Sequence, residues 1–459
     1  MTNNQTKSSE NKMKVALVNP GRGRRWTVSE PLNLGYIASC LEQNNIEVKI
    51  IDQIAGQDVK KEIEHYGPDM VGITAVTPLA PIAYKIADMC RKKGILTVMG
   101  GVHASVMPEE ALTHADVVVV GEGEMAMLDI VKSGIKSGIV SYPYVKNIDK
   151  LLPPARHLMK QDFYSNILDK IKDLMAFLPF VPPSTKVATL LTSRGCPFRC
   201  TFCHNSWRQS PVRFHSAERV ISEMKQLKED YGVEALFFMD DNFLANKPRL
   251  EEICRMMIAE KLEIIWGCNA SSHYINPTTA QMIREAGCRE LDFGWESGSQ
   301  RILDILNKST TVERNREAIR TCKEAGLMVT GTFMIGNPTE TIEDIKLTQQ
   351  FILENGIDMY GVCITTPYPG TKLWDWCNEQ GLIPKSFNWS DFNQGDLRVR
   401  ACETISASEL RELYLETFGL RPVRLSRVWK RGLWHPKESM SWVLKHPTVV
   451  AGIISRKGK

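Results

Sequence analysis

The sequence predicts an α/β protein built from a flavodoxin-like, doubly wound parallel sheet, a partial (β/α)6 barrel like a TIM barrel, and a helical carboxyl-terminal region. Short apolar runs alternate with amphipathic helical patterns from residue 13 to about 140. A second strand–helix series of about six units begins at residue 187, with no break for another sheet. At 459 residues the chain is also too long for one core, so we expect at least two domains.

The apolar runs of the front part have the length of buried strands. Their sequences are KVALVNP, EVKIID, MVGIT, LTVMGG and VVVV, separated by helical patterns such as PLNLGYIASCLEQ and APIAYKIADMCRKKG. The ends of these strands carry Asn, Thr and Gly, and doubly wound sheets bind ligands at the carboxyl edge. We therefore expect a ligand site along this edge.

Composition shifts divide the rest of the chain. A proline-rich stretch interrupts the strand–helix pattern and is predicted to connect the two sheets, packing over a site. The predicted divisions are a polar tail (1–12), a front domain (13–140), the connector (141–186), the barrel (187–387) and a helical region with a basic end (388–459).

Charge and cysteine content narrow the class of protein. The balance of 57 Lys and Arg against 53 Asp and Glu gives no general nucleic-acid footprint, so no nucleic-acid partner is expected. The 12 cysteines are scattered behind a polar start without an apolar signal core, which favours a reducing cytoplasm. No apolar run reaches the roughly 18 residues of a membrane span, so an integral membrane protein is not expected.

Three cysteines stand on one short loop after the first expected barrel strand. They are Cys196, Cys200 and Cys203 in the segment SRGCPFRCTFC. Three thiolates can bind three irons of a cubane cluster and leave the fourth iron open for a chelating amino acid. The alternative is a zinc site, which usually needs a second cysteine pair or histidines, and only His204 is near. The other cysteines are interpreted as small core residues.

This CxxxCxxC pattern, with Phe202 before the third cysteine, resembles the signature of the radical S-adenosylmethionine superfamily. The order of domains is similar to the cobalamin-binding subgroup, which includes methyltransferases and the anaerobic magnesium-protoporphyrin ester cyclase. The resemblance implies three cofactors: a [4Fe–4S] cluster on the three cysteines, S-adenosylmethionine and cobalamin. It also implies an enzyme in which the reduced cluster cleaves S-adenosylmethionine and the resulting 5′-deoxyadenosyl radical takes hydrogen from an unactivated carbon.

The same resemblance implies an S-adenosylmethionine site at the carboxyl ends of the barrel strands. The implied residues are Phe202, Asp240, Asp241, Glu296, Ser297 and Gly336. Asp240 or Asp241 can equally cap a helix, and Gly336 can serve a tight turn. Many relatives carry an arginine after the third strand, whereas this chain has NASSH at 269–273, where His273 fits an ordinary loop histidine. The partner of the S-adenosylmethionine carboxylate is therefore left open.

For the front domain, the resemblance implies cobalamin across the strand ends, with its nucleotide tail between sheet and helix. The implied residues are Asn19, Thr74, Thr77, Gly100, Gly101, Gly121, Glu122 and Gly123. The chain lacks the Asp-x-His-x-x-Gly pattern of another cobalamin family, so His103 is not assigned to cobalt. The alternative is a domain that has lost the cofactor and serves only as a docking platform.

The reaction expected from these features is cobalamin-dependent methylation of carbon. The alternatives are a radical cyclase, or an oxidative or ring-rearranging enzyme acting on a lipid or tetrapyrrole, and a non-catalytic corrinoid or iron–sulfur electron-transfer protein. The open iron argues against the last, because electron carriers normally close their clusters with four thiolates. The expected partners are a small or lipid-like substrate and an external one-electron reductant of the flavodoxin or ferredoxin type.

The segment from Arg421 onward is basic and contains Trp429, Trp434 and Trp442. Basic residues mixed with Trp are typical of a helix on an anionic membrane surface, so peripheral membrane contact is one expectation. The other expectation is a basic helical cap packed on the barrel, with its tryptophans in the core.

Overall fold

The computed structural model describes residues 12–21, 29–166, 181, 184–206 and 210–420. Its first sheet has the strand order β2-β1-β3-β4-β5-β6, and every pair is parallel. The strands are β1 (Lys14–Asn19), β2 (Glu47–Asp52), β3 (Met70–Thr74), β4 (Leu96–Gly100), β5 (Val117–Val120) and β6 (Gly138–Ser141). The first five match the expected runs, while β6 was not expected, because only two of its four residues, Ile139 and Val140, have apolar side chains.

Helices cover both faces of this sheet. They are α1 (Leu32–Glu42), α2 (Val59–Tyr66), α3 (Ala80–Lys92), α4 (Val102–Val106), α5 (Pro108–His114) and α6 (Gly123–Ser133). Successive strand residues point to opposite faces, so Leu17 packs with α1 and α6 while Ala16 and Val18 pack with α3. Strands apolar on both faces are what a covered parallel sheet requires.

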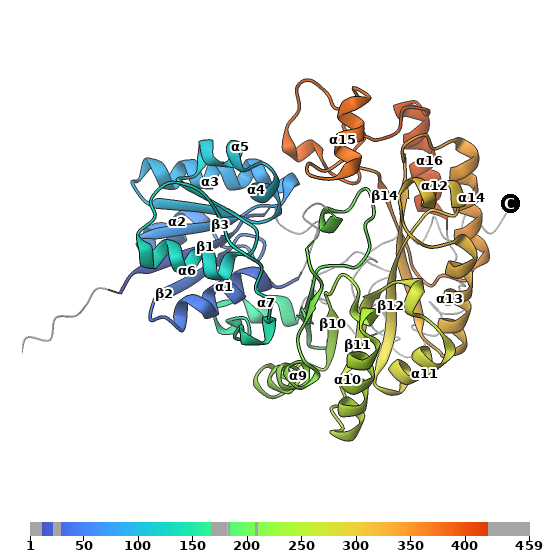
Figure 1. Cartoon of the computed structure of the whole chain (residues 1–459), viewed down its shortest axis with the longest axis horizontal. Coiled ribbons are helices and arrows are strands. Elements are labelled where there is room, and N and C mark those ends of the chain that lie inside the picture. Colours follow the sequence, from blue (N-terminus) through green and yellow to red (C-terminus); the bar gives the residue numbers. More distant parts are fainter. Residues whose placement is uncertain (1–11, 22–28, 167–180, 182–183, 207–209, 421–459) are drawn as a thin grey trace, which may run out of the picture.

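The second sheet is a six-stranded parallel half-barrel in the order β14-β13-β12-β11-β10-β7. Its strands are β7 (Val187–Leu190), β10 (Ala235–Phe238), β11 (Ile265–Ala270), β12 (Cys288–Glu296), β13 (Met328–Ile335) and β14 (Gly361–Ile364). Its helices are α9 (Ala217–Tyr231), α10 (Lys247–Ala259), α11 (Pro277–Glu285), α12 (Gln300–Ile305), α13 (Val312–Glu324) and α14 (Ile342–Glu354). Figure 1 shows α9, α10, α11, α13 and α14 on its outer side. The predicted doubly wound sheet and partial barrel are both confirmed.

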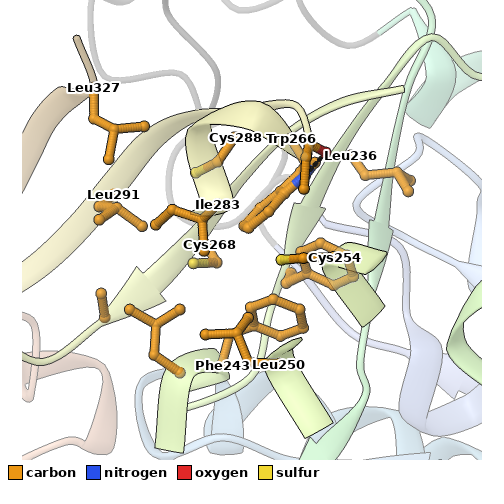
Figure 2. Packing of buried hydrophobic residues seen from close by; sticks show 14 of the residues in the cluster. Leu236, Phe243, Leu250, Cys254, Trp266, Cys268, Ile283, Cys288, Leu291 and Leu327 are labelled. Atoms are coloured by element: carbon orange, nitrogen blue, oxygen red, sulfur yellow. Dashed lines mark hydrogen bonds between the residues drawn. The ribbon is translucent and has the colours of Figure 1, made fainter. Parts of the chain in front are cut away.

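The barrel core lies between the strands and these outer helices. Trp266 is fully buried there and donates from Nε1 to the Ala286 carbonyl at 2.8 Å. Cys254, Cys268 and Cys288 surround it in the same core (Figure 2). They occupy the small buried positions expected for cysteines outside the loop motif.

The connector and the carboxyl-terminal region both run along the junction of the two sheets. Between the sheets lie η2 (Ile148–Lys150), η3 (Arg156–Leu158) and α7 (Gln161–Ser165); beyond the barrel lie α15 (Lys372–Glu379), η7 (Trp389–Asp391) and α16 (Ala407–Gly419). Trp389 donates to Glu110 of α5 at 2.6 Å, so the last region also contacts the front sheet's helices. The basic segment from Arg421 lies outside the described residues. None of the described helices is both long and apolar enough to cross a bilayer.

Candidate active site

The cysteine loop begins where β7 ends, at a small hairpin. Strand β8 (Ser193–Arg194) pairs antiparallel with β9 (Arg213–Phe214), and the loop leaves the hairpin at Gly195. Gly195 has φ of +86°, and a Cβ there would stand 2.8 Å from the Pro211 carbonyl oxygen. The position therefore requires glycine, which fixes the direction in which the chain turns towards Cys196.

The three thiols of the loop lie close enough to affect one another. Burial raises the pKa of all three, to about 11 for Cys203, and the neighbouring thiols add to the rise at Cys200 and Cys203. Within the described ranges no three His, Cys, Asp or Glu side chains are grouped to hold a single metal ion. A cubane cluster makes a different demand, since each thiolate binds a different iron.

The loop is fastened to the barrel by the turn after α12. Thr201 donates from its N–H to the Leu306 carbonyl at 2.9 Å, and Asn307 donates from its side chain to the Arg199 carbonyl at 2.7 Å. Leu373 of α15 donates to the Thr201 carbonyl at 3.0 Å. Two segments far along the chain thus fix the middle of the cysteine loop.

Glu296 ends β12 beside this turn and forms a buried ion pair. Its Oε1 lies 2.7 Å from Nζ of Lys308, and the pair lies over Gly294, where a Cβ would be only 2.4 Å from that oxygen. Glu296 has φ of +59° at a shift in the β12–β13 register. A left-handed glutamate is strained, and such strain clusters at functional sites.

Lys308 joins Glu296 to the cysteine loop. Its Nζ lies 5.9 Å from the centre of the Phe202 ring, in a cation–π arrangement. Burial lowers the pKa of Lys308, but Glu296 and then the thiols of Cys200 and Cys203 outweigh burial and raise it overall. The site therefore holds an ammonium group beside the thiols, although an arginine is missing after the third strand.

The polar turn after β10 contains three side chains with different environments. Asp240 is fully buried and accepts from the Thr192 N–H and hydroxyl, both at 2.5 Å, and from the Ser193 N–H at 3.1 Å. Asp241 is exposed and lies near enough to raise the pKa of Cys196 and Cys203. Asn242 is buried, and neither polar atom of its amide has a partner in the described part of the chain. An orphaned amide here fits a site for a polar ligand.

The strand-five motif is held by a residue outside the predicted set. Glu340 accepts from the Gly336 N–H at 2.6 Å and the Asn337 N–H at 3.0 Å. Burial raises the pKa of Glu340 to about 7, although these hydrogen bonds act to lower it. Ser297 faces α14 instead, since its Oγ lies 3.0 Å from that of Thr348. Gly336 thus belongs to a braced loop, and Ser297 to the packing of the outer helix.

The front domain contains a cavity of about 300 Å³ between its sheet, α1 and α6. Six of the eight predicted cobalamin residues line it: Thr74, Gly100, Gly101, Gly121, Glu122 and Gly123. Its floor is apolar, with Leu17, Val98 and Met127. The cavity borders the small residues at three strand ends and can hold the tail of a bulky cofactor. A domain that had lost its cofactor and served only for docking would not need such a cavity.

The other two predicted residues of this set lie outside the lining. Asn19 donates from its side chain to Asp52 at 3.0 Å, and Thr77 lies 3.2 Å from Nδ1 of His103. The other ring nitrogen of His103 lies 2.9 Å from the Tyr84 hydroxyl, and burial lowers the pKa of His103 to about 4. His103 is therefore a core side chain whose two ring nitrogens both have hydrogen-bond partners.

The cavity is completed by the barrel. Residues 191–194, here called the linking segment, contribute Leu191 and Arg194 to its lining. Arg194 is two residues from Cys196, so one short segment borders both the cavity and the cysteine loop. Opposite the cavity, Asp240 holds Thr192 and Ser193 of the same segment.

Three residues of these sites were not predicted from the sequence: Lys308, Glu340 and Arg194. No local pattern marks Lys308, because its partner Glu296 is twelve positions away across a helix. Arg194 lies next to the Gly-Cys pair, and that position was the one available signal for it.

Known protein families match both the front domain and the barrel. Residues 190–352 match the radical SAM superfamily model, and residues 25–131 match the B12 binding domain. An uncharacterized methyltransferase of Pyrococcus horikoshii is 34% identical, covering 86% of this chain and 89% of its own length. The bacteriochlorophyllide d C-8(2)-methyltransferase of Chlorobaculum tepidum is 29% identical, covering 82% of each chain.

Among solved structures, the radical S-adenosylmethionine methyltransferase TsrM of Kitasatospora setae, with cobalamin and a [4Fe–4S] cluster bound, has the same fold. The TM-score is 0.63 at 16% identity, over 88% of this chain and 82% of that one. The chain therefore belongs to the radical S-adenosylmethionine enzymes that carry a B12-binding domain, whose cofactors are a [4Fe–4S] cluster, S-adenosylmethionine and cobalamin.

Proposed function

We propose that the protein transfers a methyl group from S-adenosylmethionine, by way of cobalamin, to an unactivated carbon of a small-molecule substrate. The observation that carries this proposal is the linking segment, which borders the front cavity on one side and leads into the cysteine loop on the other. A methyl donor and a radical source must both reach one carbon, and a common border brings their sites together. The methyltransferases among the relatives support the same reaction.

The residues divide into three roles. Cys196, Cys200 and Cys203 are proposed as the cluster ligands, and the cavity as the cobalamin site. When bound, the cluster supplies the electron that cleaves S-adenosylmethionine, and cobalamin supplies the methyl group. Glu296 and Lys308 are proposed to bind the amino-acid part of S-adenosylmethionine, because they place an acceptor and a cation beside the thiols.

Reduction of the cluster is proposed to need an external one-electron donor of the flavodoxin or ferredoxin type. Around the cysteine loop the described residues offer a partly exposed approach, since Cys196 and Cys203 are neither buried nor fully exposed. We propose that the substrate also approaches beside this loop, where Asp241 is exposed.

The fate of the methyl group tests this function. With an excess of S-adenosylmethionine labelled in its methyl group, the substrate and a strong one-electron reductant, several turnovers should place the label on a carbon of the product and form 5′-deoxyadenosine, because one S-adenosylmethionine molecule gives its methyl group and a second is cleaved. Product mass spectrometry measures this. An altered product without label would contradict methyl transfer and favour a radical cyclase or rearranging enzyme.

Lys308→Met should weaken binding of S-adenosylmethionine about ten- to a hundredfold, because a hydrogen bond to a charged group contributes about 1.5–3 kcal/mol. Equilibrium dialysis with the cluster-loaded protein measures this dissociation constant. Lys308→Arg should restore most of the affinity, since it keeps the charge beside Glu296. Lys346→Met, on the exposed face of α14, is the matched control. An unchanged dissociation constant in Lys308→Met would remove Lys308 from the site.

A further inference from the structure

Glu124 has an unusual environment at the start of α6. Its side chain is 5% exposed and lines the front cavity. One oxygen, Oε1, accepts from Arg194 at 2.6 Å. The other, Oε2, is buried and has no hydrogen-bond partner among the described residues. Burying a carboxylate oxygen without a hydrogen-bond donor costs free energy. A donor on a ligand bound in the cavity would remove this cost.

Arg194 connects Glu124 of the front domain to the start of the barrel. Its guanidinium donates to Glu122 at 3.0 Å as well as to Glu124, and it stacks 5.3 Å from the centre of the Tyr36 ring on α1. Arg213, its partner across the β8–β9 hairpin, pairs with the same Glu122 at 2.9 Å. Both strands of the hairpin that leads to the cysteine loop are thus held by carboxylates of the cavity rim.

The backbone before Arg194 is fixed by both domains. Glu30 of the front domain accepts from the Thr189 N–H at 2.7 Å and hydroxyl at 2.6 Å. Asp240 of the barrel holds Thr192 and Ser193. The linking segment is therefore hydrogen-bonded to the barrel at Thr192 and Ser193, while the partners of Arg194 at its end are residues that line the cavity.

Charge alone does not account for this arrangement. Two carboxylates and two guanidiniums balance, and a purely structural ion pair would satisfy each oxygen within the chain. Glu122 meets that expectation, because its Oε2 accepts from the Val145 N–H at 2.8 Å and from Arg213. Glu124 does not, because one oxygen is directed to the barrel and the other has no partner.

We infer that Glu124 binds a hydroxyl or amide N–H donor of the cobalamin in the cavity and, through Arg194, couples occupation of the cavity to formation of the cluster site. This inference rests on the proposed cobalamin site. The coupling is reciprocal by thermodynamic necessity: if the cobalamin orders Glu124 and Arg194 for the cluster, the cluster strengthens cobalamin binding by the same factor. Arg194 is then a positioning residue, and Glu124 a binding residue.

The test compares hydroxocobalamin affinity with and without the cluster. The full chain is purified free of cobalamin, either cluster-reconstituted or stripped of iron, and hydroxocobalamin is titrated with detection by absorbance. Cluster loading should tighten wild-type binding about tenfold, within the usual range of coupling between sites. Glu124→Gln should weaken binding to the cluster-loaded protein about ten- to a hundredfold. Arg194→Lys should bring the two dissociation constants together, because an ammonium does not reach both carboxylates at once.

The control is Glu109→Gln, an exposed carboxylate on α5 of the same domain, which should behave as wild type. Far-ultraviolet circular dichroism checks that each variant is folded, and Arg194→Lys tests the coupling if Glu124→Gln does not fold. Equal affinities with and without the cluster, or Glu124→Gln matching Glu109→Gln, would overturn the inference while leaving the proposed function intact. A wild-type protein that binds no hydroxocobalamin would contradict the proposed function and the inference together.

Discussion

Replacing Cys196, Cys200 and Cys203 together by alanine should abolish both the iron–sulfur cluster and the formation of 5′-deoxyadenosine. Iron should fall from about four atoms per chain to near zero, because no other cluster ligand set is predicted. Anaerobic reconstitution followed by iron and sulfide analysis, and then incubation with S-adenosylmethionine and a strong reductant, measures both effects.

The matched control is Cys322→Ala, which changes a buried cysteine of the barrel core. It should keep the cluster and lose at most some stability, because it removes one small core side chain. A triple variant that still held four irons and cleaved S-adenosylmethionine would show that the ligands are elsewhere.

Asp240→Ala should destabilise the protein by about 3–5 kcal/mol, the cost of removing one partner from a buried charged network. The change leaves the Thr192 and Ser193 N–H groups without their acceptor. It also removes a negative charge that raises the pKa of Arg249 against the effect of burial, and the Arg249 guanidinium is buried and donates to the Thr192 hydroxyl at 2.6 Å. Urea denaturation followed by tryptophan fluorescence measures the loss.

Iron content should fall with stability in this variant, because Asp240 fixes the segment that leads into the cysteine loop. Asp241→Asn provides the comparison, since Asp241 follows directly but is exposed. If Asp240→Ala were within about 1 kcal/mol of wild type, as ordinary surface substitutions are, Asp240 would not brace the loop. If Asp240→Ala kept full stability but lost affinity for S-adenosylmethionine, Asp240 would instead be a binding residue for that cofactor, as the sequence implied.

The fold was predictable because its signals are local. Apolar runs such as VVVV at Val117–Val120 mark strands buried on both faces, whereas the equally short β6 (Gly138–Ser141) was not predicted, because only two of its side chains are apolar and none is fully buried. The cysteine loop was predictable for the same reason, as its spacing lies within eight residues.

The contacts that join the sites were not predictable, because they link residues that are distant in sequence. Glu124 meets Arg194 across 70 positions, and Thr189 meets Glu30 across 159. Asn19 looked like a ligand residue by its place at a strand end, yet the neighbouring strand supplies Asp52 as its partner. A strand end shows where a ligand can bind, and only the packed structure shows which side chains remain available for it.

The most direct test of the central claim, that one segment borders the cobalamin and cluster sites, is the magnetic interaction between the two cofactors. Protein loaded with cob(II)alamin and a reduced cluster is examined by electron paramagnetic resonance, with the triple cysteine variant as the cluster-free reference. Dipolar interaction falls steeply with distance, so adjacent sites predict faster spin relaxation of cob(II)alamin in the cluster-loaded protein. Identical cob(II)alamin relaxation with and without the reduced cluster would contradict this account.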